Sequence, residues 1–572
     1  MTLITPLGFR DILPNEAAER ERITGEVQAL FASRGYRRVE TPTLESVDAL
    51  SIGGRTPLSP FKFFDSQGDL LAMRPDVTTQ IARMAATRMA ASSSPNEELK
   101  LRYSQRIFRE SDSRGIAQAR EATQIGIEDI GAAYSGETES PQPSNAAAST
   151  AEADAEIVSL CIQALDIAGV PEVVLAMATV GPLRALLERS GATAAWKAAI
   201  LDAYHDSDLV EIERLCDIDT IPEGCAPAYA AAINKLAFIR GGREAIDDAV
   251  TLLAPLGCTD GLDVLTDTLD ALEALDVDAE LLIDFSIVSS FDYYTGFVFE
   301  AYSPNLGSPL GAGGRYDNLI GLYGESRPAA GFAFYLERAM EAASSGYDAD
   351  RPLRVAVPKG ALHEQAVECL QAAGLDVEGL DEPGRQMVIS VPGVDYIIVR
   401  PSDAPVFVAS GAADCGICGR DSLEEKDLSV VELADLHFGG CRFVVARPEG
   451  SEQAIADRYR RLGSIRVATK YPRITLRHFA KTGMQVEIVK LNGNIELAPL
   501  TGLAECIVDI TATGTTLREN DLEVAEEVMD STARFFANPC AYRTDDRIVR
   551  LARELQSSNV GKHYDPIAGK AM

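Results

Sequence analysis

The sequence lacks the features that mark membrane and secreted proteins. No window of 18 or more uncharged apolar residues occurs in its 572 residues, so no membrane-spanning helix is predicted. The N-terminus, MTLITPLGFRDILP, has neither a basic segment nor a long apolar one, so no secretory signal is expected. Ten cysteines are too few for a disulfide framework and agree with a reducing compartment. We therefore expect a cytoplasmic protein that does not contact a membrane.

Positive charge and metal-binding side chains are also scarce. With 53 Lys and Arg against 86 Asp and Glu the net charge is −33, which disfavours nucleic acid as a partner but still permits phosphorylated metabolites. The five histidines are scattered and no HExxH motif occurs, so no protein metal site is predicted. Cys415 and Cys418 form the one CxxC, in the apolar stretch DCGICG. Redox or metal chemistry is one interpretation, and packing in a buried strand is the one we favour.

The length implies two to four domains, and two stretches suggest where the chain divides. Residues 132–154, rich in Ser, Ala, Pro and acid, are predicted to form a flexible loop. Residues 341–352 (EAASSGYDADRP) separate the two main parts. The first part mixes helices and strands and has an Ala- and Leu-rich helical insertion at about 180–275. The second part alternates apolar strands with helices, which predicts an α/β fold with a largely parallel sheet.

The most informative short segment is DITATGTTLREN, residues 509–520, which follows an apolar strand. Gly514 permits a tight turn, and backbone N–H groups from Thr513 to Leu517 can point into one concavity with the hydroxyls of Thr513, Thr515 and Thr516. Asp509 can accept hydrogen bonds from two vicinal sugar hydroxyls. The segment is therefore typical of a 5-phosphoribosyl site. The alternative is an N-capped helix after a strand.

The second half closely resembles the short form of ATP phosphoribosyltransferase. The resemblance runs through LRVAVPKGALHE (353–364), DEPGRQ (381–386), IIVRPSDAPVFVASGAADCGICGRD (397–421), RVATKYP (466–472) and VEIVKLNGNIELAPLTGLAECIVDITATGTTLREN (486–520). It implies a bilobal α/β domain at 352–560, like a periplasmic binding protein, with the substrates in its cleft. It also implies the first reaction of histidine biosynthesis, in which ATP and 5-phosphoribosyl 1-pyrophosphate give phosphoribosyl-ATP and pyrophosphate, with Mg²⁺.

Because the leaving group is a diphosphate, this reaction needs cationic groups more than a covalent nucleophile. The resemblance implies that Lys359, Arg385, Arg400 and Glu496 belong to the catalytic site, with the arginines acting from a neighbouring subunit, and that Asp414 contacts ATP. Asp509 and the turn Thr513, Gly514, Thr515, Thr516 and Leu517 would hold phosphoribosyl pyrophosphate.

The first part, 1–345, resembles histidyl-tRNA synthetase. PLGFRDILPNEAAERERI (6–23), LAMRPDVTTQIARMAATR (71–88), YSQRIFRESDSRGIAQAREATQIGIEDIG (103–131), FDYYTGFVFEAYSP (291–304), GAGGRYDNL (311–319) and PAAGFAFYLERAM (328–340) follow in the order of that family. The resemblance implies a class II synthetase fold, an antiparallel sheet flanked by helices. It also implies a histidine pocket formed by Asp76, Gln124, Glu128, Tyr293, Tyr294 and Tyr316.

The departures from that family argue against aminoacylation. Ser289 stands where the family has an arginine that stabilises the adenylation transition state, and the transferase begins where an anticodon-binding domain would follow. A synthetase paralogue of this kind is the regulatory subunit of short-form ATP phosphoribosyltransferase. We therefore expect a fused, homo-oligomeric enzyme inhibited by histidine through its first part. The alternatives are a mere scaffold role for that part, an active synthetase, or a non-catalytic ligand-binding protein.

Overall fold

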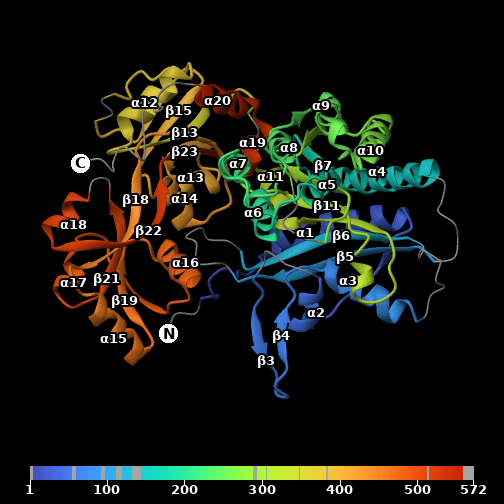
Figure 1. Ribbon diagram of the computed structural model, residues 1–572. Coiled ribbons are helices and arrows are strands. Elements are labelled where there is room, and N and C mark those ends of the chain that lie inside the picture. The colour runs from blue at the N-terminus through green and yellow to red at the C-terminus, as the bar shows by residue number, and fades with distance from the viewer. Residues whose placement is uncertain are drawn as a thin grey trace. The chain divides into compact units, whose positions relative to one another are not determined.

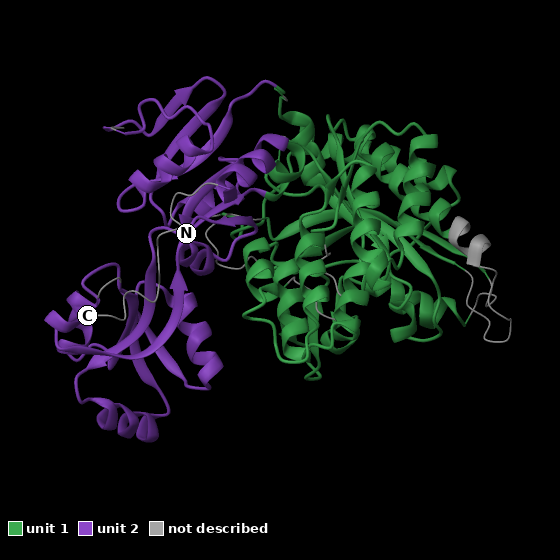
Figure 2. Ribbon diagram, turned by 45° about the horizontal axis from the view of Figure 1, so that its top comes forward, with its two compact units in different colours: residues 1–349, 539–545 green, residues 350–538, 546–572 purple. Residues whose placement is uncertain are grey.

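The computed structural model describes residues 4–53, 59–91, 97–110, 119–131, 143–287, 293–304, 306–346, 348–381, 384–511 and 514–557. The chain forms two compact units, which are considered separately (Figures 1 and 2). Unit 1 comprises residues 1–349 and 539–545, and unit 2 comprises residues 350–538 and 546–572. In the described part of the chain, no helix has the length and apolar character that a membrane crossing requires.

Unit 1 is built on a large, mostly antiparallel sheet, as a class II synthetase fold requires. Within the described residues the order of its nine strands is β1 (Arg37–Arg38), β5 (Leu99–Phe108), β6 (Glu121–Ile130), β12 (Ala329–Tyr335), β11 (Gly311–Arg315), β10 (Phe297–Tyr302), β7 (Val174–Thr179), β9 (Glu280–Asp284) and β8 (Arg240–Gly241). Only the β1–β5 and β7–β9 pairs among these are parallel. A smaller sheet has the order β2 (Leu44–Ser46), β4 (Leu70–Met73) and β3 (Lys62–Phe64).

Helices cover both the sheet and its connections. They are α1 (Pro14–Ser33), α2 (Val47–Ile52), α3 (Thr78–Met84), α4 (Pro143–Ile167), α5 (Gly181–Arg189), α6 (Ala194–His205), α7 (Leu209–Cys216), α8 (Pro227–Ala237), α9 (Glu244–Leu253), α10 (Leu262–Ala274), α11 (Leu336–Ser344) and α19 (Pro539–Thr544), with short helical turns η1 (Ala85–Met89), η2 (Ala254–Leu256) and η3 (Ile320–Leu322). Helices α5 to α10 occupy the stretch for which the sequence predicts a helical insertion. They connect the parallel neighbours β7 and β9.

The predicted loop at 132–154 differs from the structure in its second half. Residues 143–154 belong to α4, and residues 132–142 lie outside the described residues. The alanines of this stretch are strong helix formers, and Asp154 is buried against Arg315 of β11 at 2.7 Å. Composition alone therefore overstated the disorder. The packing of α4 on β11 and β12 anchors the helix.

Unit 2 has two lobes. The sheet of the first lobe has the order β14 (Val388–Val391), β15 (Val394–Val399), β13 (Leu353–Pro358), β16 (Cys415–Gly419), β23 (Ala533–Ala537) and β17 (Val431–Asp435). The sheet of the second lobe has the order β20 (Val486–Lys490), β19 (Ile465–Thr469), β21 (Cys506–Thr511), β18 (Cys441–Pro448) and β22 (Leu522–Ser531). Helices α12 (His363–Ala372), α13 (Ala404–Ala409), α14 (Arg420–Lys426) and α20 (Asp546–Ser557) accompany the first lobe, and α15 (Glu452–Leu462), α16 (Pro472–Thr482), α17 (Leu497–Leu500) and α18 (Thr515–Glu519) the second.

Both sheets of unit 2 are mixed, whereas the alternation of strands and helices predicts a largely parallel one. Parallel pairing holds for β13 with β15 and β16, and for β19 with β20 and β21. The strands beside the two crossings between lobes, β17 to β18 and β22 to β23, are antiparallel to their neighbours. The chain returns directly from one lobe to the other at these crossings, which sequence periodicity does not reveal.

Candidate functional site

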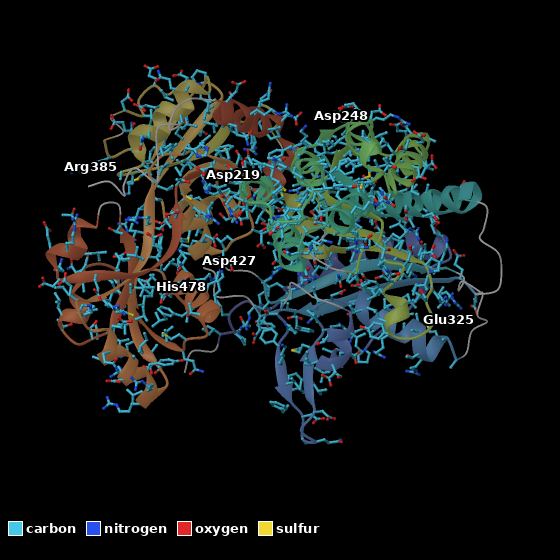
Figure 3. The ribbon with its side chains drawn as sticks, viewed as in Figure 1. Asp219, Asp248, Glu325, Arg385, Asp427 and His478 are labelled. Atoms are coloured by element: carbon cyan, nitrogen blue, oxygen red, sulfur yellow. The ribbon has the colours of Figure 1, made fainter. Side chains whose placement is uncertain are left out.

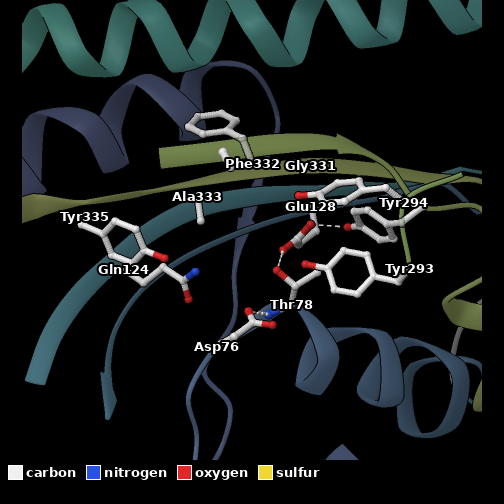
Figure 4. Close-up of a pocket in the computed structure, with 12 residues that line it drawn as sticks. Asp76, Thr78, Gln124, Glu128, Tyr293, Tyr294, Gly331, Phe332, Ala333 and Tyr335 are labelled. Carbon is white, nitrogen blue, oxygen red and sulfur yellow. Dashed lines mark hydrogen bonds between the residues drawn. The ribbon is translucent and has the colours of Figure 1, made fainter. Parts of the chain in front are cut away.

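A cavity of about 40 Å³ lies on one face of the large sheet of unit 1 (Figure 4). This is space for about three water molecules, so a larger ligand must displace lining side chains. The six residues predicted to bind histidine all line it: Asp76, Gln124, Glu128, Tyr293, Tyr294 and Tyr316. The other lining residues are Thr78, Ala312, Gly331, Phe332, Ala333 and Tyr335. The structure therefore brings the whole predicted set together, although these residues come from distant parts of the chain.

Glu128 is the centre of the hydrogen-bond network in this pocket. Its carboxylate accepts from the Thr78 hydroxyl at 2.8 Å, from the Tyr103 hydroxyl at 3.3 Å and from the Tyr316 hydroxyl. β6 and β12 pair so that Glu128 faces Gly331, where a Cβ would lie 2.0 Å from the carboxylate. Only glycine at position 331 leaves room for this carboxylate.

The pocket holds two buried acids. Burial raises the pKa of Glu128 to about 8, because desolvation of the charged form outweighs its hydroxyl donors, and the charge of Asp76 adds to the rise. Burial also raises the pKa of Asp76, although the Thr78 N–H donates to Oδ1 at 2.7 Å. Oδ2 of Asp76 has no hydrogen-bond partner among the described residues. A cationic donor entering the pocket would satisfy both acids.

Three tyrosine rings form the aromatic wall of the pocket. The centroid of Tyr293 lies 4.8 Å from that of Tyr294 and 5.8 Å from that of Tyr316. On the opposite side Tyr335 lies under Arg109, whose guanidinium donates to the Tyr335 hydroxyl at 2.9 Å. An acid pair beside aromatic faces suits an ammonium or imidazole group. Ser289, which carries the argument against adenylation, lies outside the described residues.

In unit 2 the predicted cations follow parallel strands. Lys359 follows β13 and Arg400 follows β15, and the Lys359 N–H donates to the Val399 carbonyl at 2.8 Å. Arg385 is exposed just before β14 (Figure 3). Among the described residues the side chains of these three cations have no hydrogen-bond or ion-pair partner. The carboxyl ends of parallel strands are where ligands of α/β proteins bind, so Lys359 and Arg400 are placed to meet an anion.

The second lobe brings Asp509, Glu496 and Lys470 together. Asp509 lies near the end of β21, and its carboxylate accepts from the Ile510 N–H at 2.8 Å. Burial raises the pKa of Asp509 to about 6, the nearby charge of Glu496 contributes to the rise, and Lys470 opposes it. Lys470 is not among the site residues predicted from the sequence. The signal was present, because Lys470 follows β19, the parallel neighbour of β21.

Gly514 has the left-handed conformation that a tight turn after β21 requires. Gly514 has φ +71°, and its N–H donates to the Thr511 hydroxyl at 2.8 Å. Thr515 and Thr516 are exposed at the start of α18, whereas the side chain of Leu517 is buried in the core of the second lobe. Leu517 can therefore contribute only its backbone to a ligand. Thr513 lies outside the described residues.

The carboxylate of Asp414, which the resemblance assigns to ATP, is engaged by two arginines in the structure. Its carboxylate is buried and forms ion pairs with Arg351 at 2.7 Å and with Arg354 at 2.7 Å. These guanidiniums hold its pKa below the usual value, against the effect of burial. Asp414 precedes β16, at the amino end of the parallel strands and opposite to Lys359. Its role is to join β13 and β16. A motif match does not distinguish the two ends of a strand.

The CxxC is part of the core. Cys415 and Cys418 both lie in β16 and are buried, and both are free thiols. Burial raises the pKa of Cys418, which disfavours the reactive thiolate. Among the described residues no group of three or more His, Cys, Asp and Glu side chains is arranged to hold a metal ion.

Taken together, the two sites are typical of a transferase that acts on a sugar phosphate, joined to a class II synthetase-like unit with a small ligand pocket. Comparisons with known proteins agree with both parts. Residues 8–142 and 144–339 match the family model of histidyl-tRNA synthetase, and residues 400–557 match that of ATP phosphoribosyltransferase.

Individual relatives match each half of the chain over most of their length. An ATP phosphoribosyltransferase of Rubrobacter xylanophilus is 48% identical over 219 residues, which is 38% of this chain and 100% of the relative. An ATP phosphoribosyltransferase regulatory subunit of Moorella thermoacetica is 35% identical over 340 residues, 59% of this chain and 81% of the relative. A crystal structure from Bacillus halodurans, described as an ATP phosphoribosyltransferase regulatory subunit/histidyl-tRNA synthetase, aligns with TM-score 0.52 and 26% identity over 70% of this chain and 99% of its own.

The chain belongs to the ATP phosphoribosyltransferase family, with a histidyl-tRNA synthetase-like regulatory part and a transferase part in one polypeptide.

Proposed function

We propose that unit 2 catalyses the transfer of the phosphoribosyl group to ATP and that free histidine, bound in the pocket of unit 1, inhibits this reaction. The observation that supports catalysis is the arrangement after β21, where Asp509 precedes a glycine turn with two exposed threonines. The observation that supports regulation is the pocket with two buried acids and a wall of tyrosines.

In the transfer, N1 of the ATP adenine forms a bond to C1 of the ribose while the bond from C1 to the diphosphate oxygen breaks. The bonding electrons leave with the diphosphate, so negative charge grows there and positive charge grows on the ribose. The carboxylate of Asp509 accepts hydrogen bonds from the ribose hydroxyls, and Thr515 and Thr516 donate to the 5-phosphate. Lys359 and Arg400 take up the charge of the departing diphosphate.

Mg²⁺ fits this site. Burial raises the pKa of Asp509 to about 6, and the nearby charge of Glu496 adds to the rise, so a cation beside both carboxylates would favour their ionised forms. Carboxylates and substrate phosphates are the usual ligands of Mg²⁺ in such enzymes. Bound between Asp509, Glu496 and the diphosphate, the ion would neutralise leaving-group charge. The chain's own contribution is to orient the ribose and to keep Asp509 ionised.

The exposed Arg385, without a partner in the described part of its own chain, supports a homo-oligomer in which a neighbouring subunit supplies this guanidinium. Ten free cysteines, nine of them buried, support a location in a reducing compartment such as the cytoplasm.

The test is a pyrophosphate-release assay with ATP and phosphoribosyl pyrophosphate, with and without histidine. We expect turnover that depends on both substrates and falls on addition of histidine. Asp509→Asn is expected to lose turnover by about 10²–10³-fold, in line with the loss of one group that stabilises a transition state. Asp457→Asn, on the exposed helix α15, is the matched control. An enzyme that releases no pyrophosphate, or one that Asp509→Asn leaves intact, would refute the assignment.

A further inference from the structure

One helix belongs to unit 1 although the chain on both sides of it belongs to unit 2. Helix α19 lies between β23 and α20 in the sequence, yet it packs on β10 and β7 of the large sheet. Its residues Cys540, Ala541, Tyr542 and Arg543 are all buried. A segment of the transferase part of the sequence therefore completes the core of the regulatory unit.

The contacts that hold α19 are polar and only partly satisfied. Nε of Arg543 lies 3.4 Å from Oδ2 of Asp284, and neither atom has a hydrogen bond among the described residues. Arg240 donates to the backbone carbonyl of Tyr542 at 2.7 Å and packs 4.6 Å from its ring centroid. A buried ion pair whose facing atoms lack hydrogen bonds is sensitive to small displacements, so the position of α19 depends on the side chains packed against it.

Helix α19 lies on the face of the sheet that carries the pocket. Side chains alternate between the two faces of each strand, and the register pairs Glu300 of β10 with Ala312, which lines the pocket. Tyr302, two residues after Glu300, is on the same face. The guanidinium of Arg543 lies 5.2 Å from the Tyr302 ring centroid. By contrast, α4 packs on the opposite face, through the ion pair of Asp154 with Arg315.

A short row of side chains leads from the pocket to this helix. Tyr335 lines the pocket, and the guanidinium of Arg338 lies 4.5 Å from its ring centroid. Burial raises the pKa of the Cys540 thiol to about 12, and the positive charges of Arg543 and Arg338 oppose that rise, so Arg338 lies within electrostatic range of α19. Tyr335, Arg338 and Cys540 thus connect the pocket wall to α19.

The geometry points to α19 as the element that couples the pocket to the transferase, an inference that rests on the proposed regulation by histidine. Because the cavity has room for only about three waters, a bound amino acid must displace part of its wall. Displacement of Tyr335 moves Arg338 and changes how α19 packs on the sheet.

One residue separates α19 from β23, an inner strand of the first-lobe sheet. That residue, Asn538, is buried, and its N–H donates to the Asp414 carbonyl at 2.9 Å. Its side chain donates to the Val408 carbonyl at 3.0 Å. A change in the position of α19 therefore acts directly on a strand of the catalytic unit, which is what a coupling between two sites requires.

The experiment measures two quantities on the full chain. One is the factor by which saturating histidine lowers turnover, and the other is the dissociation constant of histidine, measured by calorimetry without substrates. The variants are Arg240→Gln, which loosens α19 mildly, and the double variant Arg543→Gln, Asp284→Asn, which removes both buried charges together. The control is Asp154→Asn, which breaks a buried Arg–Asp pair on the opposite face of the same sheet. Basal turnover, thermal melting and the oligomeric state establish that each variant folds.

We expect both α19 variants to bind histidine within about threefold of the wild type while the inhibition factor falls toward one. Asp154→Asn should retain the wild-type inhibition factor. Inhibition that is unchanged in both α19 variants, or lost equally in the control, would overturn the role of α19. A wild-type enzyme that turns over but ignores histidine would instead overturn the proposed regulation itself, and this role with it.

Discussion

Replacement of Glu128 by glutamine removes a buried ionisable group whose charged form lowers the free energy of unfolding. The folded pKa, about 8, lies above the ordinary value of 4.5, so folding favours the protonated carboxyl. The free-energy penalty for burying the Glu128 carboxylate is nearly absent at low pH, and it grows as the pH rises from 4.5 to about 8. From these two values it is about 1 kcal/mol at pH 5.5 and about 4 kcal/mol at pH 8. Glutamine keeps the shape and can still exchange hydrogen bonds with Thr78, Tyr103 and Tyr316.

The assay is thermal unfolding of wild type and Glu128→Gln at pH 5.5 and pH 8, combined with histidine inhibition of turnover at each pH. We expect the variant to melt several degrees above the wild type at pH 8, with a clearly smaller gap at pH 5.5. It should lose histidine inhibition and retain basal turnover. A melting gap that is equal at both pH values would refute the argument from burial. Inhibition that persists unchanged would refute the placement of histidine beside Glu128.

Three further predictions concern individual residues. Since Asp509 has a raised pKa of about 6, kcat/KM should fall up to tenfold per pH unit below pH 6, and Glu496→Gln, which removes the repulsion, should shift that fall to lower pH in a pH–rate profile. Asp414→Asn should destabilise unit 2 by about 3–5 kcal/mol in denaturant unfolding, because it leaves two arginines without their shared partner, while the KM for ATP stays unchanged. Gly331→Ala should displace Glu128 and weaken histidine inhibition more than tenfold in the same turnover assay, with basal activity intact.

The sequence predicts regular elements and the contents of the pocket well, because both depend on local patterns. Helices α5 to α10 occupy the predicted helical stretch at about 180–275, and the residues of the predicted histidine set all line the pocket. For the histidine-binding residues, the matched motifs specify both the residue type and its position along the chain. The same reasoning places Glu496 close to Asp509.

The sequence does not predict features that depend on how strands pair and where the chain crosses between lobes or units. Asp414 sits in a matched motif, but only the register of β13 with β16 shows that it faces Arg351 and Arg354 at the amino end of the strands. The mixed sheets result from the crossings of the chain between the two lobes, and the position of α19 results from its crossing between the two units. Sequence periodicity does not reveal either kind of crossing. Lys470 was missed because a single lysine after a strand has no distinctive pattern.

The burial of α19 also bears on what the peptide link between residues 345 and 352 accomplishes. A single proteolytic cut there would leave two fragments that remain associated, because the C-terminal one contributes a helix to the core of the N-terminal one. Separately encoded polypeptides could dock through the same helix. The continuous chain therefore fixes a one-to-one ratio of sensor to enzyme, and the buried helix adds a non-covalent attachment to the covalent one.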